Sequence, residues 1–318
     1  MKSKKEYDFI ILGAGGTGLA AAMYAARLGL KTLILGYSHG YELPTGGVIT
    51  TTHLVENYPG FTKITGPELA KKLEEHARAY KLVTIKSERA IEIKKIKNSF
   101  HVKTNKSEYI AKTILFATGT KWRKLDIPGS REFENKGVSY CVLCDGPLFK
   151  NKTVAVIGGS DTAAKDALLL SKYAKKVYMI YRGNKIHPEQ INLERIKQNK
   201  KIEIISNTNL TEIKGKQNVT SVMLDKAYKG SKELRLDSVF VTIGNIVLSE
   251  LAKPLGVKLN KSGEILINHM TSETNVSGIF AAGDVTDKPF KQLITGVADG
   301  CTAAYSAYEY INKKKVVG

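Results

Sequence analysis

The chain has 318 residues, of which 42% are hydrophobic and 25% are charged, so it is long enough for two domains and has the composition of a globular protein. Its formal net charge of +19 attracts acidic partners, but the basic residues are scattered and no nucleic-acid-binding motif accompanies them, so we predict no nucleic-acid partner. No apolar run reaches the roughly 18 residues of a membrane span and the charged first residues show no signal-peptide core, so we expect no membrane association and a cytoplasmic location.

The first predicted unit is a strand, a glycine-rich turn, a helix and a second strand. An apolar run at 7–12 leads into the glycines of 13–18, an alanine-rich segment at 19–28 favours a helix, and 31–35 is apolar again. The later elements are expected in chain order as a helix at 67–80, strands within 84–116, a strand at 153–157, a turn at 158–163, a helix at 164–173, strands at 176–181 and 238–243, a strand-to-glycine turn at 278–284 and a helix at 296–311.

The first glycine turn matches a dinucleotide-binding fingerprint. Gly13 permits a tight turn, Gly15 lets the backbone approach a pyrophosphate, and Gly18 lets the helix pack close to the strand. Because a strand precedes the turn and a helix follows it, we predict a dinucleotide site at the start of that helix. The acidic residue that usually holds a ribose after the second strand is replaced by Gly36-Tyr37.

The second glycine turn, at 158–163, repeats the scheme less well. Gly158 and Ala163 occupy the first and last places, but Ser160 replaces the middle glycine, and its side chain narrows the approach of a pyrophosphate. A ligand site and a vestigial turn both remain open for this loop. The recurrence of the unit predicts an α/β fold with two Rossmann-like dinucleotide-binding domains.

Cys141-Val-Leu-Cys144 contains two of the three cysteines and is followed by Asp145. A zinc site would need two more soft ligands, which neither the isolated Cys301 nor a histidine pair offers, so we predict no metal. A structural disulfide is the second reading, disfavoured by the expected compartment. A redox-active pair is the favoured reading, with Asp145 as its acid–base group or, alternatively, as a turn-capping carboxylate. Cys301 is expected to be a small buried residue.

These motifs together resemble the low-molecular-weight thioredoxin reductases. The resemblance covers essentially the whole chain, and the segments that carry it, in order, are 13–18, 46–47, 55–60, 117–119, 139–146, 157–159, 279–285 and 298–304. Flavoprotein reductases without a thiol pair would share the glycine loops but not residues 141–146. The resemblance is therefore specific.

The resemblance implies a homodimeric enzyme with FAD as cofactor and a thioredoxin-like protein as partner. Electrons would pass from a donor to the flavin, then to the thiol pair and then to the partner. Cys144 would face the flavin, Cys141 would attack the partner's disulfide, and Asp145 would act as acid and base. The FAD site would comprise Gly13, Gly15, Gly16, Thr17, Gly18, Gly47, Asn57, Gly119, Gly283, Asp284, Lys291, Gln292 and Leu293, with Asp284 at the ribityl chain.

The resemblance also implies that one domain is inserted into the other. Residues 1–118 and 246–318 would form a discontinuous FAD-binding domain, and residues 119–245 an inserted pyridine-nucleotide-type domain that carries the thiol pair. The candidate nicotinamide residues are Gly158, Gly159, Ser160, Asp161, Thr162, Arg182 and His187.

The electron donor is where the chain departs from the family. NADPH users carry a His-Arg-Arg-x-x-x-Arg stretch that clamps the 2′-phosphate, whereas this chain has Tyr181-Arg182-Gly183 with His187 in the last place. Two charge-assisted contacts at roughly 1.5–3 kcal/mol each are lost, which weakens NADPH selectivity by orders of magnitude. NADH, a reduced deazaflavin and an acidic reduced ferredoxin therefore stand beside NADPH as candidate donors.

Two other functions fit the same motifs. A dithiol oxidase would keep the fold and pass electrons from a small thiol to oxygen. A flavin-bearing sensor would use the thiol pair to report redox state without turnover.

Overall fold

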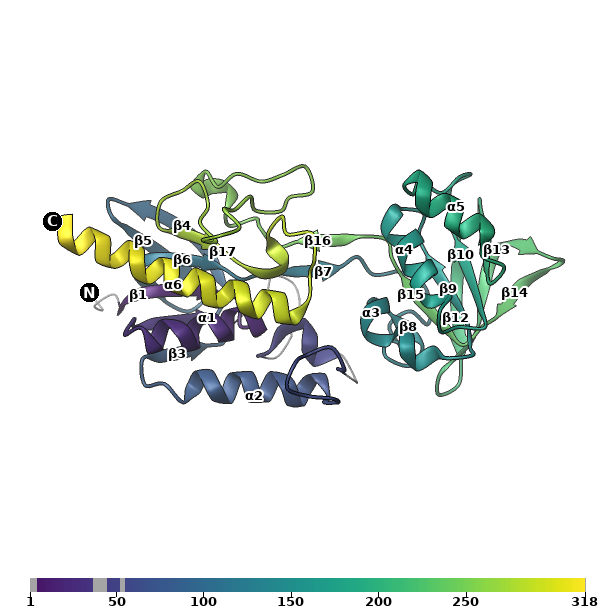
Figure 1. Ribbon diagram of the computed structural model, residues 1–318, viewed down its shortest axis with the longest axis horizontal. Helices are drawn as coiled ribbons and strands as arrows, with labels where there is room; N and C mark the ends of the chain where they lie inside the picture. Colours follow the sequence, from purple (N-terminus) through teal and green to yellow (C-terminus); the bar gives the residue numbers. More distant parts are fainter. Residues whose placement is uncertain (1–4, 37–44, 52–54, 318) are drawn as a thin grey trace. The chain divides into compact units, whose positions relative to one another are not determined.

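A computed structural model describes residues 5–36, 45–51 and 55–317 (Figure 1). The chain forms two compact units, one of residues 1–121 with 246–318 and one of residues 122–245. It passes between them along β7 (Thr120–Trp122) and β16 (Asn245–Val247), which pair with each other. Both units contain a largely parallel sheet with helices, so the predicted α/β class with a second Rossmann-like domain inserted into the first is confirmed.

Unit 1 is built on a sheet with the strand order β3-β2-β1-β6-β5-β4, and β17 pairs with the last residues of β6, beyond those that pair with β5. All pairs are parallel except β4–β5 and β5–β6. The strands are β1 (Lys5–Leu12), β2 (Thr32–Leu35), β3 (Val83–Lys86), β4 (Ala90–Ile96), β5 (Ser99–Thr104), β6 (Glu108–Phe116) and β17 (Ile279–Ala281).

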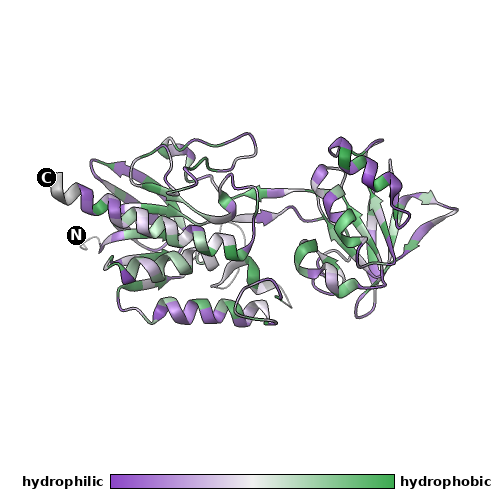
Figure 2. Ribbon diagram, viewed as in Figure 1, coloured by the Kyte–Doolittle hydropathy of each residue, from purple (hydrophilic) through white to green (hydrophobic). Residues whose placement is uncertain are grey.

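The helices of unit 1 are α1 (Gly16–Arg27), α2 (Gly66–Arg78) and α6 (Leu293–Val317), with short 3₁₀ turns η1 (Gly47–Thr51), η3 (Lys253–Leu255) and η4 (Gly283–Val285). Helix α2 begins with a capping box, because Thr65 accepts from the backbone of Glu68 while the Glu68 carboxylate accepts from the Thr65 backbone. Figure 2 shows mixed polarity along α2 and hydrophobic strands in the sheet. None of the helices in the described part of the chain combines the length and apolarity that a bilayer crossing requires.

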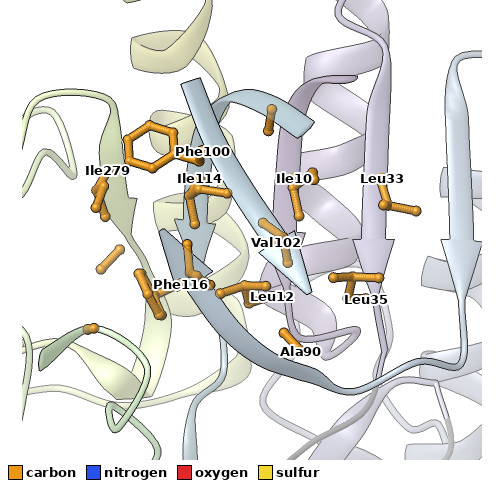
Figure 3. Close-up of a cluster of buried hydrophobic side chains, with 14 of the residues drawn as sticks. Ile10, Leu12, Leu33, Leu35, Ala90, Phe100, Val102, Ile114, Phe116 and Ile279 are labelled. Carbon is orange, nitrogen blue, oxygen red and sulfur yellow. The ribbon is translucent and has the colours of Figure 1, made fainter. Parts of the chain in front are cut away.

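The core of unit 1 lies against the sheet. Ile10 and Leu12 of β1 meet Leu33 of β2 and the aromatic rings of Phe100 and Phe116, all of them buried (Figure 3). Burying each such side chain contributes about 1.5–3 kcal/mol. This packing fixes the carboxyl ends of β1 and β6, from which the first glycine loop and Gly119 emerge.

Unit 2 is built on a parallel sheet with the strand order β11-β10-β9-β15-β8. Its strands are β8 (Val138–Ser139), β9 (Thr153–Ile157), β10 (Lys176–Ile180), β11 (Ile202–Ile205) and β15 (Ser238–Val241). A separate antiparallel sheet holds β12 (Leu210–Gly215), β13 (Val219–Tyr228) and β14 (Ser231–Arg235). The helical segments are α3 (Val142–Asp145), η2 (Gly146–Phe149), α4 (Asp161–Leu170) and α5 (Gln190–Gln198).

Helix starts differ from the expected ones at both glycine turns. Helix α1 begins at Gly16 rather than residue 19, and α4 begins at Asp161 rather than residue 164. The reason at α4 is a side-chain cap, since the Ser160 hydroxyl accepts a hydrogen bond from the Ala163 backbone. Helix α6 likewise begins at Leu293 instead of residue 296.

Candidate active site

The three fingerprint glycines of the first glycine turn have two different roles. Gly13 has φ +112°, and a Cβ there would lie 2.2 Å from the Ala117 carbonyl oxygen. A Cβ at Gly18 would lie 2.0 Å from the Gly13 carbonyl oxygen. At Gly15, by contrast, the nearest described atom would be 3.8 Å away. Gly13 and Gly18 are therefore required by the fold, whereas the space beside Gly15 leaves the backbone accessible to a ligand.

The other residues predicted for the FAD site converge on this turn. Gly46 donates its N–H to the Ala14 carbonyl at 2.7 Å, and this contact places η1 beside the turn. The Thr17 side chain lies against the backbone of Gly283, and Leu293 lies against Gly16. Unit 1 thus brings the start of α1, η1, η4 and the start of α6 together.

The loop after β17 carries a half-buried acid, Asp284. Burial raises the pKa of the Asp284 carboxyl, and no group in the described part of the chain donates a hydrogen bond to it. Lys291 does not pair with this carboxylate. Its ammonium donates to the carbonyl oxygens of Asp284 and Thr286, at 3.0 and 2.9 Å, and pairs with Glu264. Lys291 therefore fixes the backbone of the loop, and the Asp284 carboxylate is left to accept from a ligand.

Three more predicted residues lie at the edge of this site. The Asn57 amide donates to the Gln292 side-chain oxygen at 3.1 Å, which connects the segment after η1 to the segment before α6. Gly119, with φ +67°, follows β6, and its carbonyl accepts from the Leu248 backbone at 3.1 Å. Of the Gly36-Tyr37 pair that replaces the usual ribose-binding acid, Tyr37 lies outside the described residues.

The cysteine pair of unit 2 forms a disulfide at the start of α3. Cys141 and Cys144 have Cα atoms 5.3 Å apart, and the Cys144 N–H donates to the Cys141 sulfur at 3.2 Å. Both cysteines are half-buried, and Leu143 between them is 50% exposed. The segment that carries the disulfide therefore lies at the surface of unit 2.

The residues on either side hold this motif in place. Asp145, the last residue of α3, accepts a hydrogen bond from the Ser139 hydroxyl at 2.6 Å, and that hydroxyl accepts from the Cys141 N–H at 3.2 Å. Tyr140 stacks on Trp122 with ring centroids 5.4 Å apart. The arrangement suits thiol–disulfide exchange, which needs two sulfurs in bonding range and a group that carries a proton.

The second glycine turn is less open than the first. A Cβ at Gly159 would lie 2.5 Å from a ring carbon of Tyr181, so the ring covers the backbone that is accessible at Gly15 in the first turn. Asp161 is engaged by the chain itself, since Lys165 and Asn192 lower its pKa to about 2 and the Glu189 backbone donates to it. The packing of the Tyr181 ring is therefore enough to account for a glycine at position 159, without a bound ligand.

The candidate nicotinamide side chains beyond this turn are exposed. The His187 backbone donates to the Gly159 carbonyl at 2.7 Å, so His187 is held beside the turn. Arg182 is exposed, as is Thr162 on α4. Gly158 has φ +155° and packs against the Thr242 carbonyl.

Sequence reasoning missed two residues that shape these sites. Ser139 lies within a segment that carries the resemblance, but no pattern shows that its hydroxyl reaches Asp145, six residues later. Tyr181 is notable in the sequence only as a replacement in the phosphate clamp, and its packing on Gly159 depends on the fold. Cys301, expected to be buried, is only half-buried in α6. Within the described residues, no three His, Cys, Asp or Glu side chains gather as a metal site.

Known proteins resemble the chain over its full length. The pyridine nucleotide-disulphide oxidoreductase family profile matches residues 7–303. A thioredoxin reductase of Treponema pallidum is 39% identical over 310 residues, covering 96% of this chain and 98% of that protein. One of Bacillus subtilis is 38% identical over 321 residues, covering 98% and 97%. The crystal structure of a thioredoxin reductase from Streptococcus pyogenes superimposes with a TM-score of 0.87 at 33% identity, covering 98% of this chain and 100% of that one.

These matches span both units and include the disulfide of α3 and the open glycine turn of α1. The chain therefore belongs to the pyridine nucleotide-disulphide oxidoreductase family and, within it, to the low-molecular-weight thioredoxin reductases.

Proposed function

We propose that this protein is an FAD-dependent thioredoxin-disulfide reductase. The observation that carries the proposal is the Cys141–Cys144 disulfide, half-buried at the start of α3 with Asp145 held beside it. Full-length relatives that bear the name thioredoxin reductase support this function over a dithiol oxidase or a sensor without turnover. The test is anaerobic reduction of thioredoxin by the reduced holoenzyme, followed by thiol titration.

The residues around the first glycine turn fit FAD. The space beside Gly15 admits a pyrophosphate at the start of α1, where helix N–H groups favour an anion. The buried carboxylate of Asp284, which receives no donor within the described chain, would accept a hydrogen bond from a hydroxyl of the cofactor. When bound, FAD supplies the two electrons that reduce the Cys141–Cys144 disulfide. We assign unit 1 as the FAD-binding domain and unit 2 as the domain that carries the thiol pair.

The thiols then reduce the partner in two exchange steps. The Cys141 thiolate attacks one sulfur of the partner's disulfide, which forms a mixed disulfide and releases the partner's other sulfur as a thiolate. The Cys144 thiolate then attacks the Cys141 sulfur, which restores the Cys141–Cys144 bond and releases the second partner thiol. Asp145 takes a proton from an attacking thiol and gives it to a leaving sulfur, so the partner gains two electrons and two protons in all.

The buried carboxyl of Asp284 predicts opposite effects of Asp284→Asn with and without FAD. The folded-state pKa of Asp284 lies above 3.8 because of burial, so folded apoprotein holds this proton more tightly than unfolded chain and loses stability as pH rises through that raised pKa. Asp284→Asn should therefore raise the melting temperature of the apoprotein at pH 7, by an amount that shrinks as the pH falls to and below the ordinary aspartate pKa of about 3.9. In the holoprotein it should weaken FAD binding about tenfold or more, because an ionised acceptor is lost.

Thermal melts of both forms and flavin titration check this prediction. An Asp284→Asn apoprotein less stable than wild type at pH 7, together with unchanged FAD affinity, would contradict the assigned role.

The second glycine turn does not fit a pyridine dinucleotide as the first turn fits FAD. The Tyr181 ring covers Gly159, and Arg182 is the one arginine at the clamp positions. We propose that NADPH is not selected over NADH, and we assign no step to either nucleotide. An acidic reduced ferredoxin is the donor that the +19 net charge favours, and a reduced deazaflavin is the remaining candidate.

Anaerobic mixing with NADPH, NADH, reduced ferredoxin or reduced deazaflavin tests this proposal by the loss of flavin absorbance. We expect NADPH and NADH to reduce the flavin slowly and with less than about tenfold difference in rate, because one guanidinium remains. His187→Arg, at an exposed position beside the turn, should raise the preference for NADPH about tenfold by adding a charge-assisted contact. Rapid reduction of the wild type by low micromolar NADPH would refute the proposal.

The remaining proposals follow from family membership. We propose a homodimer, which light scattering tests, and a thioredoxin as the physiological partner. We propose a cytoplasmic location, because a thiol pair that must return to the dithiol state suits a reducing compartment.

A further inference from the structure

Ser139 is a buried polar residue beside the redox pair. It ends β8, where parallel pairing with β15 places it opposite Phe240, so its backbone is fixed by the sheet. Its hydroxyl donates to Asp145 Oδ2 at 2.6 Å and accepts the Cys141 N–H at 3.2 Å. A single side chain therefore contacts both the acid group and the backbone of the first cysteine.

The direction of these hydrogen bonds is determined by chemistry. A hydroxyl has one proton to give, and the Cys141 N–H can only donate, so the Ser139 proton goes to the carboxylate. A distance of 2.6 Å is typical of an O–H donor on an ionised acceptor. The bond therefore fixes the position of the Asp145 carboxylate relative to the start of the cysteine motif.

We propose that Ser139 is a positioning residue for thiol–disulfide exchange, which holds the Asp145 carboxylate beside the cysteine pair. The inference rests on the proposed function, in which Asp145 carries that proton. The Ser139 proton stays on Ser139 throughout, and the transferred proton moves from the attacking thiol to Asp145 and then to the leaving sulfur.

The charged groups on neighbouring elements have partners of their own. On α4, which packs on α3, Asp161 pairs with Lys165 at 2.6 Å, and Asp166 accepts from the Thr242 hydroxyl at 2.8 Å. Near Tyr140, Lys124 pairs with Glu134 at 2.6 Å. The other titratable groups on segments next to α3 are Lys150, which follows η2, and Lys172 and Tyr173, which follow α4. Because all of these groups are present in every variant below, a change of pH profile reports the Ser139 contact.

The test uses the holoenzyme and three single substitutions. Ser139→Ala removes the hydroxyl, Ser139→Thr keeps one, and Ser130→Ala is the matched control. Ser130 is also buried in unit 2, but its hydroxyl contacts only the backbone carbonyls of Leu125 and Ile127. The two readouts are the pH dependence of alkylation of the reduced cysteine pair and the pH dependence of thioredoxin reduction.

Ser139→Ala should slow thioredoxin reduction about tenfold at pH 7, because the group that carries the proton is no longer held in place. It should also move the midpoint of the alkylation profile to lower pH, because a carboxylate held beside a thiol disfavours its thiolate form. Ser139→Thr should return the midpoint toward that of the wild type. Ser130→Ala should lower the melting temperature without moving the midpoint.

A double-mutant cycle separates positioning from general structure. In an Asp145→Asn background, Ser139→Ala should change the alkylation rate less than about twofold, since the two residues act together. An equal change of the alkylation rate in both backgrounds, or a Ser139→Ala midpoint that matches the wild type, would overturn the inference. If the wild type reduced no thioredoxin while the alkylation profile still shifted, the proposed function would fall and the Ser139 contact would stand.

Discussion

Replacing Cys144 by serine is expected to abolish thioredoxin reduction, with a loss of about a thousandfold or more, while FAD stays bound. Cys144 closes the intramolecular disulfide, and without it the mixed disulfide between Cys141 and the partner cannot be resolved. FAD is retained because its proposed site lies in unit 1 and Cys144 lies in unit 2. Steady-state turnover and flavin absorbance per chain are the two measurements.

Cys301→Ser is the matched control for that prediction. Burial raises the pKa of the Cys301 thiol to about 11, so little of it is thiolate at neutral pH and we expect it to take no part in exchange. The variant should keep its turnover. Full activity of Cys144→Ser, or loss of activity in Cys301→Ser alone, would refute the assignment of the redox pair.

Alanine substitutions in the first glycine turn should give two different phenotypes. Gly13→Ala should destabilise the fold by several kcal/mol, because φ +112° is unfavourable for alanine and its Cβ would lie 2.2 Å from a backbone oxygen. Gly15→Ala should leave the chain folded, since the nearest described atom is 3.8 Å away, yet should bind FAD at least about tenfold more weakly because the methyl group occupies the approach of the pyrophosphate.

Melting temperatures and FAD titration separate the two phenotypes. Gly29→Ala serves as a control, since Gly29 has φ +80° and no described atom lies within 4 Å of a Cβ there. This substitution should lower the free energy of unfolding by about 1 kcal/mol without loss of flavin. Normal FAD affinity in a folded Gly15→Ala variant would show that the turn does not hold the cofactor.

The parts of the fold that depend on local pattern were predictable from the sequence. The two strand–turn–helix units follow from apolar periodicity and from glycine spacing, because the fingerprint encodes both a close helix–strand contact and a backbone left open for a ligand. Gly13 and Gly18 meet backbone oxygens as that pattern requires. The cysteine spacing likewise placed two sulfurs within bonding range.

The features that depend on distant contacts were not predictable. The first residues of α1 and α4 lie inside the glycine turns, because helical hydrogen bonding begins before the first good helix former. Gly159 matches a ligand-binding glycine in sequence, but the ring that covers it comes from Tyr181 at the end of the next strand. The burial of Asp284 and the contact of Ser139 with Asp145 arise from packing after the chain has folded.

The most direct test of the central claim is a single turnover of the wild-type holoenzyme. The enzyme is reduced anaerobically by two electrons per chain, mixed with oxidised thioredoxin, quenched by alkylation and digested for mass spectrometry. The account predicts one thioredoxin dithiol per chain. In samples quenched before mixing, Cys141 and Cys144 should be alkylated, and in samples quenched after mixing they should be joined as a disulfide. Thioredoxin reduced in full while Cys141 and Cys144 stay disulfide-bonded from start to finish would contradict it.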